Sequence, residues 1–397
     1  AMSDTTRAAE RRLREDSPTI EAVSQLLEEG TDPKNSSLLR DFSHLFLSRA
    51  SEEVLRQRSP EDLAAMISSS FEFLEASRPF RVDVSVVNPA TSGTWADAVT
   101  VIRTNVSERP FIIDSIREYL TAEGISIERM IYPIVDVERD EEGSVLGIKA
   151  PGDGGSKESI VHLEIARIED LPRLAEMAEA LTTLLQDVVR STDDFQPMID
   201  SVESVIESVG RNIVDMPDRA EEFEEIQHFL RWLRDGGFIF LGARRYDLLD
   251  TEEREEPAIV VEPGSGLGLL RNEGDSRFAE PIPLSKLDPG MRELAIHGPV
   301  LIINKTNAES TVHRRARMDY VGVKKLDEQG NVVGEYRFIG LFTSKAYAEP
   351  AGSIPILRHK LARVLEVSGV REGSHDYKEI ITIFDSLPKE QLLLASS

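Results

Sequence analysis

Apolar residues recur at helical spacing along the first part of the chain. One set lies between residues 20 and 27, and a second lies between residues 38 and 46. The polar stretch 30–35 separates them and contains glycine and proline, which interrupt helices. A third helix is predicted over 59–76, because a serine that can cap it is followed by a proline and two acidic residues. Residues 1–78 are therefore expected to form a helical segment.

The pattern changes to mixed strands and helices after residue 80. Strands are predicted over 81–87, 95–106, 125–138, 145–149 and 159–168, and helices over 110–123 and 171–190. The order is strand, helix, strand, strand and helix, with an extra strand in front. This order is typical of a ferredoxin-like or ACT-type α/β sandwich, which we predict over residues 79–192.

Residues 193–235 are expected to be a helical connector in two pieces, broken near Met216 and Pro217. Further strands are predicted over 238–246, 258–262, 299–305, 319–326 and 336–343, with a hairpin turn at 327–331 and a short helix at 289–297. These few-helix, mostly antiparallel elements favour a PAS-like or profilin-like sheet domain over 236–350. Helices at 354–368 and 374–387 close the chain within 351–397, and its apolar end suggests a cut from a longer polypeptide. The predicted fold class is α+β.

Composition narrows the classes of function. The 397 residues include 46 Lys and Arg against 71 Asp and Glu, so the net charge is −25, which argues against general nucleic-acid binding. The chain has no cysteine, which excludes disulfides, cysteine-ligated zinc, iron–sulfur clusters and a cysteine nucleophile. No apolar run approaches the ~20 residues of a membrane span, and the polar start is no signal peptide. We expect a soluble cytoplasmic protein without a membrane partner.

Catalytic motifs do not emerge from the sequence. The glycine-rich stretch 262–268 follows a strand, but its spacing and the residues after it favour a turn over a phosphate loop. The glycines at 152–155 indicate a flexible loop, and acidic runs such as 252–256 indicate solvated faces. The seven histidines show no metal-binding spacing, and no serine-hydrolase motif occurs. We therefore predict no catalytic, cofactor-binding or metal-binding residue in this segment.

A first candidate site lies where a predicted strand meets the helix at 110–123. Ser107 or Glu108 could accept hydrogen bonds from free helix N–H groups, and Pro110 suits the first helical position. Together with Arg109, these groups could form an anion pocket for a carboxylate effector. Ser107, Arg109 and Asp114 are the candidate contacts. The alternative, which the pattern alone favours, is a tight turn with an exposed arginine.

A second candidate is a basic cluster within this acidic chain. It consists of Lys305, His313, Arg314, Arg315 and Arg317. Such a cluster attracts an anion, which could be a phosphate, a carboxylate or an acidic face of another domain. An intramolecular contact is the interpretation that we favour.

Several segments resemble a known family. They are 108–115 (ERPFIIDS), 131–134 (IYPI), 229–242 (FLRWLRDGGFIFLG), 310–314 (STVHR), 319–324 (DYVGVK), 338–344 (FIGLFTS) and 374–378 (SHDYK). In this order and spacing they resemble the N-terminal region of the large bacterial NAD-dependent glutamate dehydrogenases. Glu108 stands where that family usually has aspartate, and Tyr132 stands where it often has histidine.

The resemblance implies a non-catalytic regulatory and assembly segment of a much longer enzyme. That enzyme converts L-glutamate, NAD and water to 2-oxoglutarate, ammonia and NADH, in a C-terminal domain outside this chain. NAD is then a cofactor of the full-length enzyme and not of this segment. The partners implied are the catalytic domain of the same polypeptide, further copies in a homotetramer, and an amino-acid effector.

Three other interpretations remain open. ACT-like sheets can pair edge to edge, so the segment could be a purely structural oligomerisation scaffold. It could also be a stand-alone amino-acid-binding ACT protein. A complete small enzyme that uses Arg314 and His313 is the third, and it predicts turnover by the isolated chain.

Overall fold

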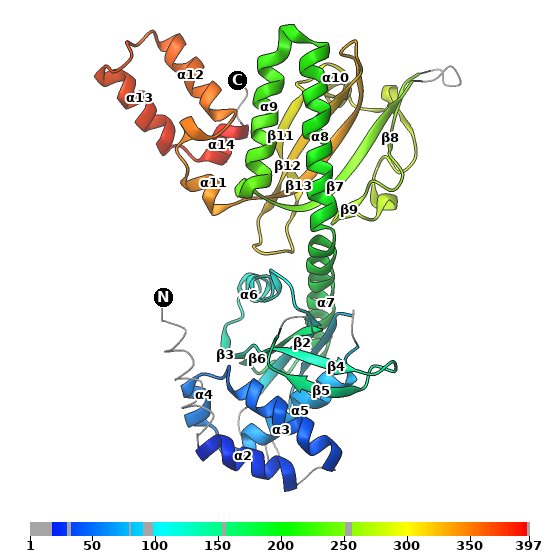
Figure 1. The fold of residues 1–397 in the computed structure, drawn as a ribbon, viewed down its shortest axis with the longest axis vertical. Coiled ribbons are helices and arrows are strands. Elements are labelled where there is room, and N and C mark those ends of the chain that lie inside the picture. The colour runs from blue at the N-terminus through cyan, green and yellow to red at the C-terminus, as the bar shows by residue number, and fades with distance from the viewer. Residues whose placement is uncertain are drawn as a thin grey trace. The chain divides into compact units, whose positions relative to one another are not determined.

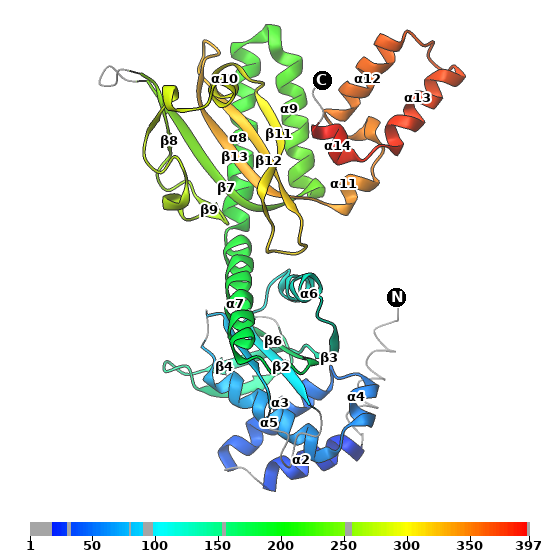
Figure 2. The same cartoon turned by 180° about the vertical axis from the view of Figure 1, so that it is seen from behind.

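The computed structural model describes residues 18–29, 33–78, 81–89, 98–152, 156–250 and 256–394. Contacts divide the chain into two compact units, of which the first comprises residues 1–188 with 311–315, and the second comprises 189–310 with 316–397. Each unit contains one antiparallel sheet with helices packed on it (Figures 1 and 2). The predictions for residues 1–17, 95–97, 153–155, 252–255 and 395–397 lie outside the described residues.

Within the described residues before the first sheet, the three predicted helices form and one further helix lies among them. These helices are α2 (Pro18–Glu29), α3 (Pro33–Leu47), α4 (Glu52–Gln57) and α5 (Pro60–Ala76). The hydroxyl of Ser59 accepts a hydrogen bond from the Asp62 N–H at 3.1 Å, which confirms the predicted cap of α5. The short helix α4 was not predicted, and Ser51 caps it in the same way.

The first sheet has six strands, all paired antiparallel. They are β1 (Asp83–Val87), β2 (Val99–Ser107), β3 (Ile127–Ile131), β4 (Ile134–Arg139), β5 (Val145–Lys149) and β6 (Lys157–Ala166). Their order is β1-β2-β6-β4-β5, and β3 also pairs with β6. The single strand predicted over 125–138 is wrong, because the chain breaks into β3 and β4 at Tyr132 and Pro133. Proline has no N–H to donate to a strand ladder, so an interruption there is expected.

Helices cover both faces of this sheet. Val99 and Val101 of β2 share a hydrophobic core with α2, α3 and α5 on one face. Side chains alternate along a strand, so the buried Ile102 points to the opposite face. The helices α6 (Ile112–Ala122) and α7 (Leu171–Asp193) lie on that side, above the sheet in Figure 1. Gly124 follows α6 with a φ of 71°, a left-handed conformation that glycine often adopts at the end of a helix.

The second unit begins with two helices packed on a seven-stranded sheet. They are α8 (Phe195–Asp215) and α9 (Ala220–Trp232), separated by a 3₁₀ turn at Pro217–Arg219. The strands are β7 (Phe238–Leu249), β8 (Ala258–Val261), β9 (Leu267–Gly268), β10 (Ile282–Pro283), β11 (Leu301–Glu309), β12 (Arg317–Leu326) and β13 (Val332–Phe342). Their order is β10-β8-β7-β13-β12-β11, β9 also pairs with β7, and all pairs are antiparallel. The two-residue strands β9 and β10 were not predicted, because they are too short to show a periodicity.

A hydrophobic core joins α8 and α9 to this sheet, and α9 contributes large aromatic side chains to it. Phe223 and Phe229 of α9 share one core with Phe238, Phe240 and Phe338 of the sheet. The predicted helix α10 (Pro289–His297) is confirmed, and α11 (Ser344–Ala348), α12 (Leu357–Ser368), α13 (His375–Ser386) and α14 (Lys389–Leu394) complete the unit. Helices combined with two antiparallel sheets confirm the predicted α+β class. Across the described residues, no helix is both long and apolar enough to span a bilayer.

The glycine-rich stretch 262–268 forms a turn that uses its own amides. The N–H groups of Gly264 and Gly266 donate to the carboxylate of Glu273, at 3.2 and 2.8 Å. The N–H of Gly268 donates to Asp194 at 2.7 Å. Because carboxylates of the same chain accept from these amides, the interpretation as a turn is confirmed and a phosphate loop is not supported.

Candidate functional site

The start of α6 differs from the predicted anion pocket. The helix begins at Ile112, and Phe111 precedes it in the left-handed region with a φ of 73° and no side-chain cap. Pro110 is therefore not the first helical residue, and neither Ser107 nor Glu108 caps the helix. Ser107 ends β2, and its carbonyl accepts from Nε of Arg109 at 3.0 Å. The guanidinium of Arg109 therefore binds the backbone of its own turn.

Glu108 points toward the sheet instead. Its carboxylate accepts from the hydroxyl of Ser159 and lies 3.5 Å from the hydroxyl of Tyr132. Burial raises the pKa of Glu108, and it also raises the pKa of Tyr132. Glu108 and Tyr132 are therefore in contact with each other.

A segment distant in sequence contacts the first turns of α6. Residues 311–315, between β11 and β12, belong to the first unit. The N–H of His313 donates to Oγ of the buried Ser115 at 2.8 Å, and its imidazole ring lies against the Phe111 ring at 5.2 Å. Nδ1 of His313 is 3.7 Å from a carboxylate oxygen of Asp114. Two features that the sequence showed separately, around Asp114 and His313, therefore meet.

Two further hydrogen bonds hold this segment to acidic side chains. The N–H of Arg315 donates to Glu118 of α6 at 3.3 Å. The hydroxyl of Thr311 donates to Asp187 of α7 at 2.9 Å. Arg314 lies half-buried in the same segment. A backbone N–H and a hydroxyl of this segment therefore donate to acidic side chains on two helices.

The remaining members of the predicted basic cluster lie in the second unit. Nζ of Lys305 is 2.7 Å from the buried Asp319 and also contacts Glu390 of α14. Arg317 donates to the carbonyl of Thr306 at 3.2 Å and to the side chain of Asn307 at 3.1 Å. Lys305 and Arg317 contact each other, since Nζ of Lys305 donates to the carbonyl of Arg317 at 3.1 Å. Their side chains meet partners in the second unit, whereas His313 and Arg315 contact α6.

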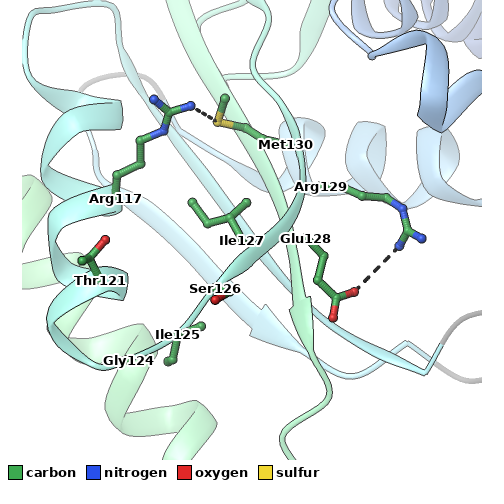
Figure 3. A pocket seen from close by; sticks show the side chains of 9 residues that line it. All are labelled: Arg117, Thr121, Gly124, Ile125, Ser126, Ile127, Glu128, Arg129 and Met130. Carbon is green, nitrogen blue, oxygen red and sulfur yellow. Dashed lines mark hydrogen bonds and ion pairs between the residues drawn. The ribbon is translucent and has the colours of Figure 1, made fainter.

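An open groove lies at the other end of α6. It has a volume of about 660 Å³ and is bordered by Arg117 and Thr121 of α6, the loop 124–126 and the strand β3 (Figure 3). A guanidinium nitrogen of Arg117 is 3.6 Å from the sulfur of Met130. Arg129 and Glu128, 4.0 Å apart, add one charge of each sign. The groove thus combines guanidinium, carboxylate and hydroxyl groups on a partly apolar floor.

Sequence reasoning missed this groove for a physical reason. Its lining residues fall inside one predicted strand and the end of one predicted helix, where side chains are expected to pack. Among the described strands, β3 pairs only with β6, so its other edge is available to border a groove. The proline at position 133 was the available signal, since it limits how far the strand can extend.

Comparison with known proteins places these elements in a family. A model described as glutamate dehydrogenase, ACT1 domain, matches residues 42–181, which include the whole first sheet and α6. A second model, glutamate dehydrogenase, helical motif 1, matches residues 354–397. The first match confirms the predicted ACT-like fold of this region.

Curated relatives agree with these matches. The chain is 32% identical over 359 residues to the NAD-specific glutamate dehydrogenase of Pseudomonas aeruginosa, which covers 88% of this chain and 22% of the relative. It is 28% identical over 379 residues to that of Halomonas elongata, covering 94% of the chain and 23% of the relative. For Mycobacterium tuberculosis the identity is 25% over 292 residues, covering 72% and 16%. The chain thus spans less than a quarter of the length of these relatives, and it belongs to the family of large NAD-specific glutamate dehydrogenases, whose N-terminal region it represents.

Proposed function

We propose that this chain is a non-catalytic regulatory and assembly segment of a large NAD-dependent glutamate dehydrogenase. The ACT1 match over the groove-bearing first unit is the observation that carries the proposal. In this proposal, oxidation of L-glutamate by NAD takes place in a catalytic domain outside this chain, in a cytoplasmic homo-oligomer. The segment itself then holds neither NAD nor a metal.

The proposed effector is a small amino acid bound in the groove between α6 and β3. Its carboxylate would pair with the guanidinium of Arg117, and its ammonium group would pair with Glu128. The groove is favoured over the start of α6, where Asp114 faces His313 of the same chain. Ser107, Arg109 and Asp114 stay candidates from the sequence alone. An effector regulates only if it binds two states of the enzyme with different affinities.

Calorimetry with a panel of amino acids tests this role. We expect at least one to bind, and R117M to lose that binding, because the variant removes the cation without enlarging the side chain. The matched control is R292M, which changes an exposed arginine of α10 in the second unit. If no amino acid binds the chain, the regulatory role is refuted. If the isolated chain oxidises glutamate with NAD, the non-catalytic assignment is refuted.

An assembly role rests on exposed apolar side chains of the helical motif. Val364 and Val367 of α12 and Ile383 of α13 are 41%, 81% and 60% exposed. Such a group of side chains on one helical hairpin is typical of a protein-protein contact. We expect light scattering to show self-association of the chain and V367E/I383E to abolish it. A wild-type chain that stays monomeric at high concentration contradicts self-association through these helices.

The second sheet supports a PAS-like assignment within this proposal. Its five long strands, numbered along the chain, lie in the order second, first, fifth, fourth and third. Helices α8 and α9 pack on one face through a shared aromatic core. The division into segments 1–78, 79–192, 193–235, 236–350 and 351–397 stays a prediction from the sequence. Limited proteolysis followed by mass spectrometry tests it.

A further inference from the structure

Charged side chains are buried between the first sheet and the helices α4 and α5. Arg58, Arg103, His162 and Glu164 are each at most 6% exposed. Arg103 of β2 lies opposite His162 of β6, and Val101 lies opposite Glu164. Cross-strand partners point to the same face, which is the face that α5 covers through Val101 and its neighbours. Burial of several charges at one place is costly unless each finds a partner.

Glu164 is already fully engaged in this cluster. One carboxylate oxygen accepts from Arg58 at 2.6 Å and from Arg129 at 3.0 Å. The other oxygen lies 3.5 Å from Nε2 of His162, whose Nδ1 is 3.3 Å from the hydroxyl of Ser70. Three side chains thus contact this carboxylate, and Arg103 is not one of them.

Arg103 is the side chain that the cluster does not satisfy. It is 4% exposed, and its Nε and Nη2 donate to no acceptor within the part of the chain that the structure describes. Glu72 and Glu164 act on it only through the electrostatic field. Burial lowers the pKa of Arg103 to about 10, so the group stays charged at neutral pH. Buried donors without an acceptor are rare in folded proteins and call for an explanation.

The acids near this face do not supply that acceptor. Glu164 is held by Arg58 and Arg129, and Glu128 lies 4.0 Å from Arg129. Glu72 acts on Arg103 through the electrostatic field alone. Burial lowers the pKa of His162, which keeps the imidazole neutral at physiological pH. A single small anion would supply the missing acceptor.

We propose that Arg103 binds a small carboxylate or oxyanion enclosed between α5 and the first sheet. In this site, Nε and Nη2 of Arg103 donate two parallel hydrogen bonds to the anion. This bidentate geometry suits a carboxylate and a phosphate alike. The bound anion links the helical segment to the sheet, because α5 covers one side of it and β2 supplies the guanidinium. Arg129 borders both this cluster and the groove at α6, but Arg103 does not line the groove. The proposed site therefore does not depend on the proposed amino-acid effector.

Thermal unfolding of the whole chain tests the site. Sodium phosphate and sodium acetate are titrated separately, with ionic strength held constant by a bulky sulfonate salt that is too large for a buried site. We expect a saturable rise in Tm of about 5–10 °C near a hundredfold excess over Kd. A response to phosphate alone identifies an oxyanion site, and a response to acetate alone identifies a carboxylate site.

Variants separate this effect from general salt stabilisation. R103M removes the two donors and is expected to unfold independently of both anions, while being at least as stable as the wild type in their absence. R103K keeps the positive charge but cannot donate two parallel hydrogen bonds. It serves as the folded variant if R103M does not fold, and its Tm is expected to rise less with added anion. R40M, which changes an exposed arginine of α3 in the same unit, is expected to keep the full response.

Three results would overturn the proposal. One is a wild-type Tm that neither anion raises. Another is an equal rise in wild type and R103M, which would mean general salt stabilisation. The third is strong coupling between R103M and E72Q in a double-mutant cycle without added anion, which would make Glu72 the partner of Arg103 in solution.

Discussion

The backbone N–H of His313 donates to the hydroxyl of Ser115 over 2.8 Å, across 198 residues of sequence. Ser115 is 1% exposed, so its hydroxyl is a buried acceptor. We expect S115A to destabilise the first unit by about 1–3 kcal/mol, because the variant leaves a backbone donor unpaired. Urea unfolding measures the effect. T311A, which changes an exposed hydroxyl of the same segment, is the control and is expected to cost less.

The conformation of His313 gives a second prediction. Its φ of 68° lies in the left-handed region, where a residue with a Cβ is strained and glycine is not. Both H313A and H313G remove the contacts with Phe111 and Asp114. We therefore expect H313G to be more stable than H313A by about 1 kcal/mol. Equal stability of the two variants would show that the left-handed conformation does not persist in solution.

Because the carboxylate of Glu164 is buried and paired, we expect the free energy of unfolding to depend on pH in the acid range. Burial alone would raise its pKa, but the contacts with His162, Arg58 and Arg129 hold the pKa at about 2. A carboxyl whose folded pKa lies below its ordinary value of 4.5 stabilises the fold above pH 4.5. That contribution, about 3 kcal/mol, is lost as the pH falls toward 2. Urea unfolding between pH 2 and 6 should show a shallower loss for E164Q than for the wild type.

Glu108 and Tyr132 provide a test of coupling. Their side chains lie 3.5 Å apart and share Ser159. We expect E108D and Y132H to destabilise the chain singly, and the double variant to lose less than the sum, by about 0.5–2 kcal/mol. A double-mutant cycle by urea unfolding gives the coupling energy. Additive effects on the free energy of unfolding would mean that Glu108 and Tyr132 contribute to stability independently.

Glu225 anchors the start of the helical motif. Its buried carboxylate accepts from the N–H of Ile356 at 2.6 Å and from Nε of Arg358 at 2.9 Å. Ile356 has a φ of 71°, which is unusual for a β-branched residue and needs such support. We expect E225A to increase hydrogen exchange across α12 and α13. H375A, which breaks only an exposed ion pair with Glu379, should leave exchange unchanged.

Local chemistry explains which parts of the fold the sequence could predict. The cap of α5 depends on Ser59 and the residues that follow it. The hairpin between β12 and β13 depends on Asp327, whose carboxylate accepts from the N–H groups of Gln329 and Asn331, at 2.9 and 2.8 Å. Both signals lie within a few residues, so a pattern can carry them.

The parts that could not be predicted depend on distant partners. Helix α6 starts late because Phe111 takes a left-handed conformation and packs against His313, and nothing near Phe111 in the sequence signals that partner. Lys305 and His313 lie only eight positions apart in the sequence. In the structure, however, Lys305 pairs with Asp319 and His313 pairs with Asp114. A charge pattern can show that a cluster is basic, but only the tertiary structure decides which acid each member meets.

The interruption at Pro133 has a mechanical consequence. Strand β3 is held to β6 by four residue pairs between Ile127 and Ile131, whereas β4 has its own ladder to β6 and a second one to β5. Because the two ladders are discontinuous, β3 can detach or shift without disturbing the hairpin of β4 and β5. Pro133 therefore divides the chain beside β6 into two independently paired strands. The strand that can separate from β6 is β3, which borders the groove.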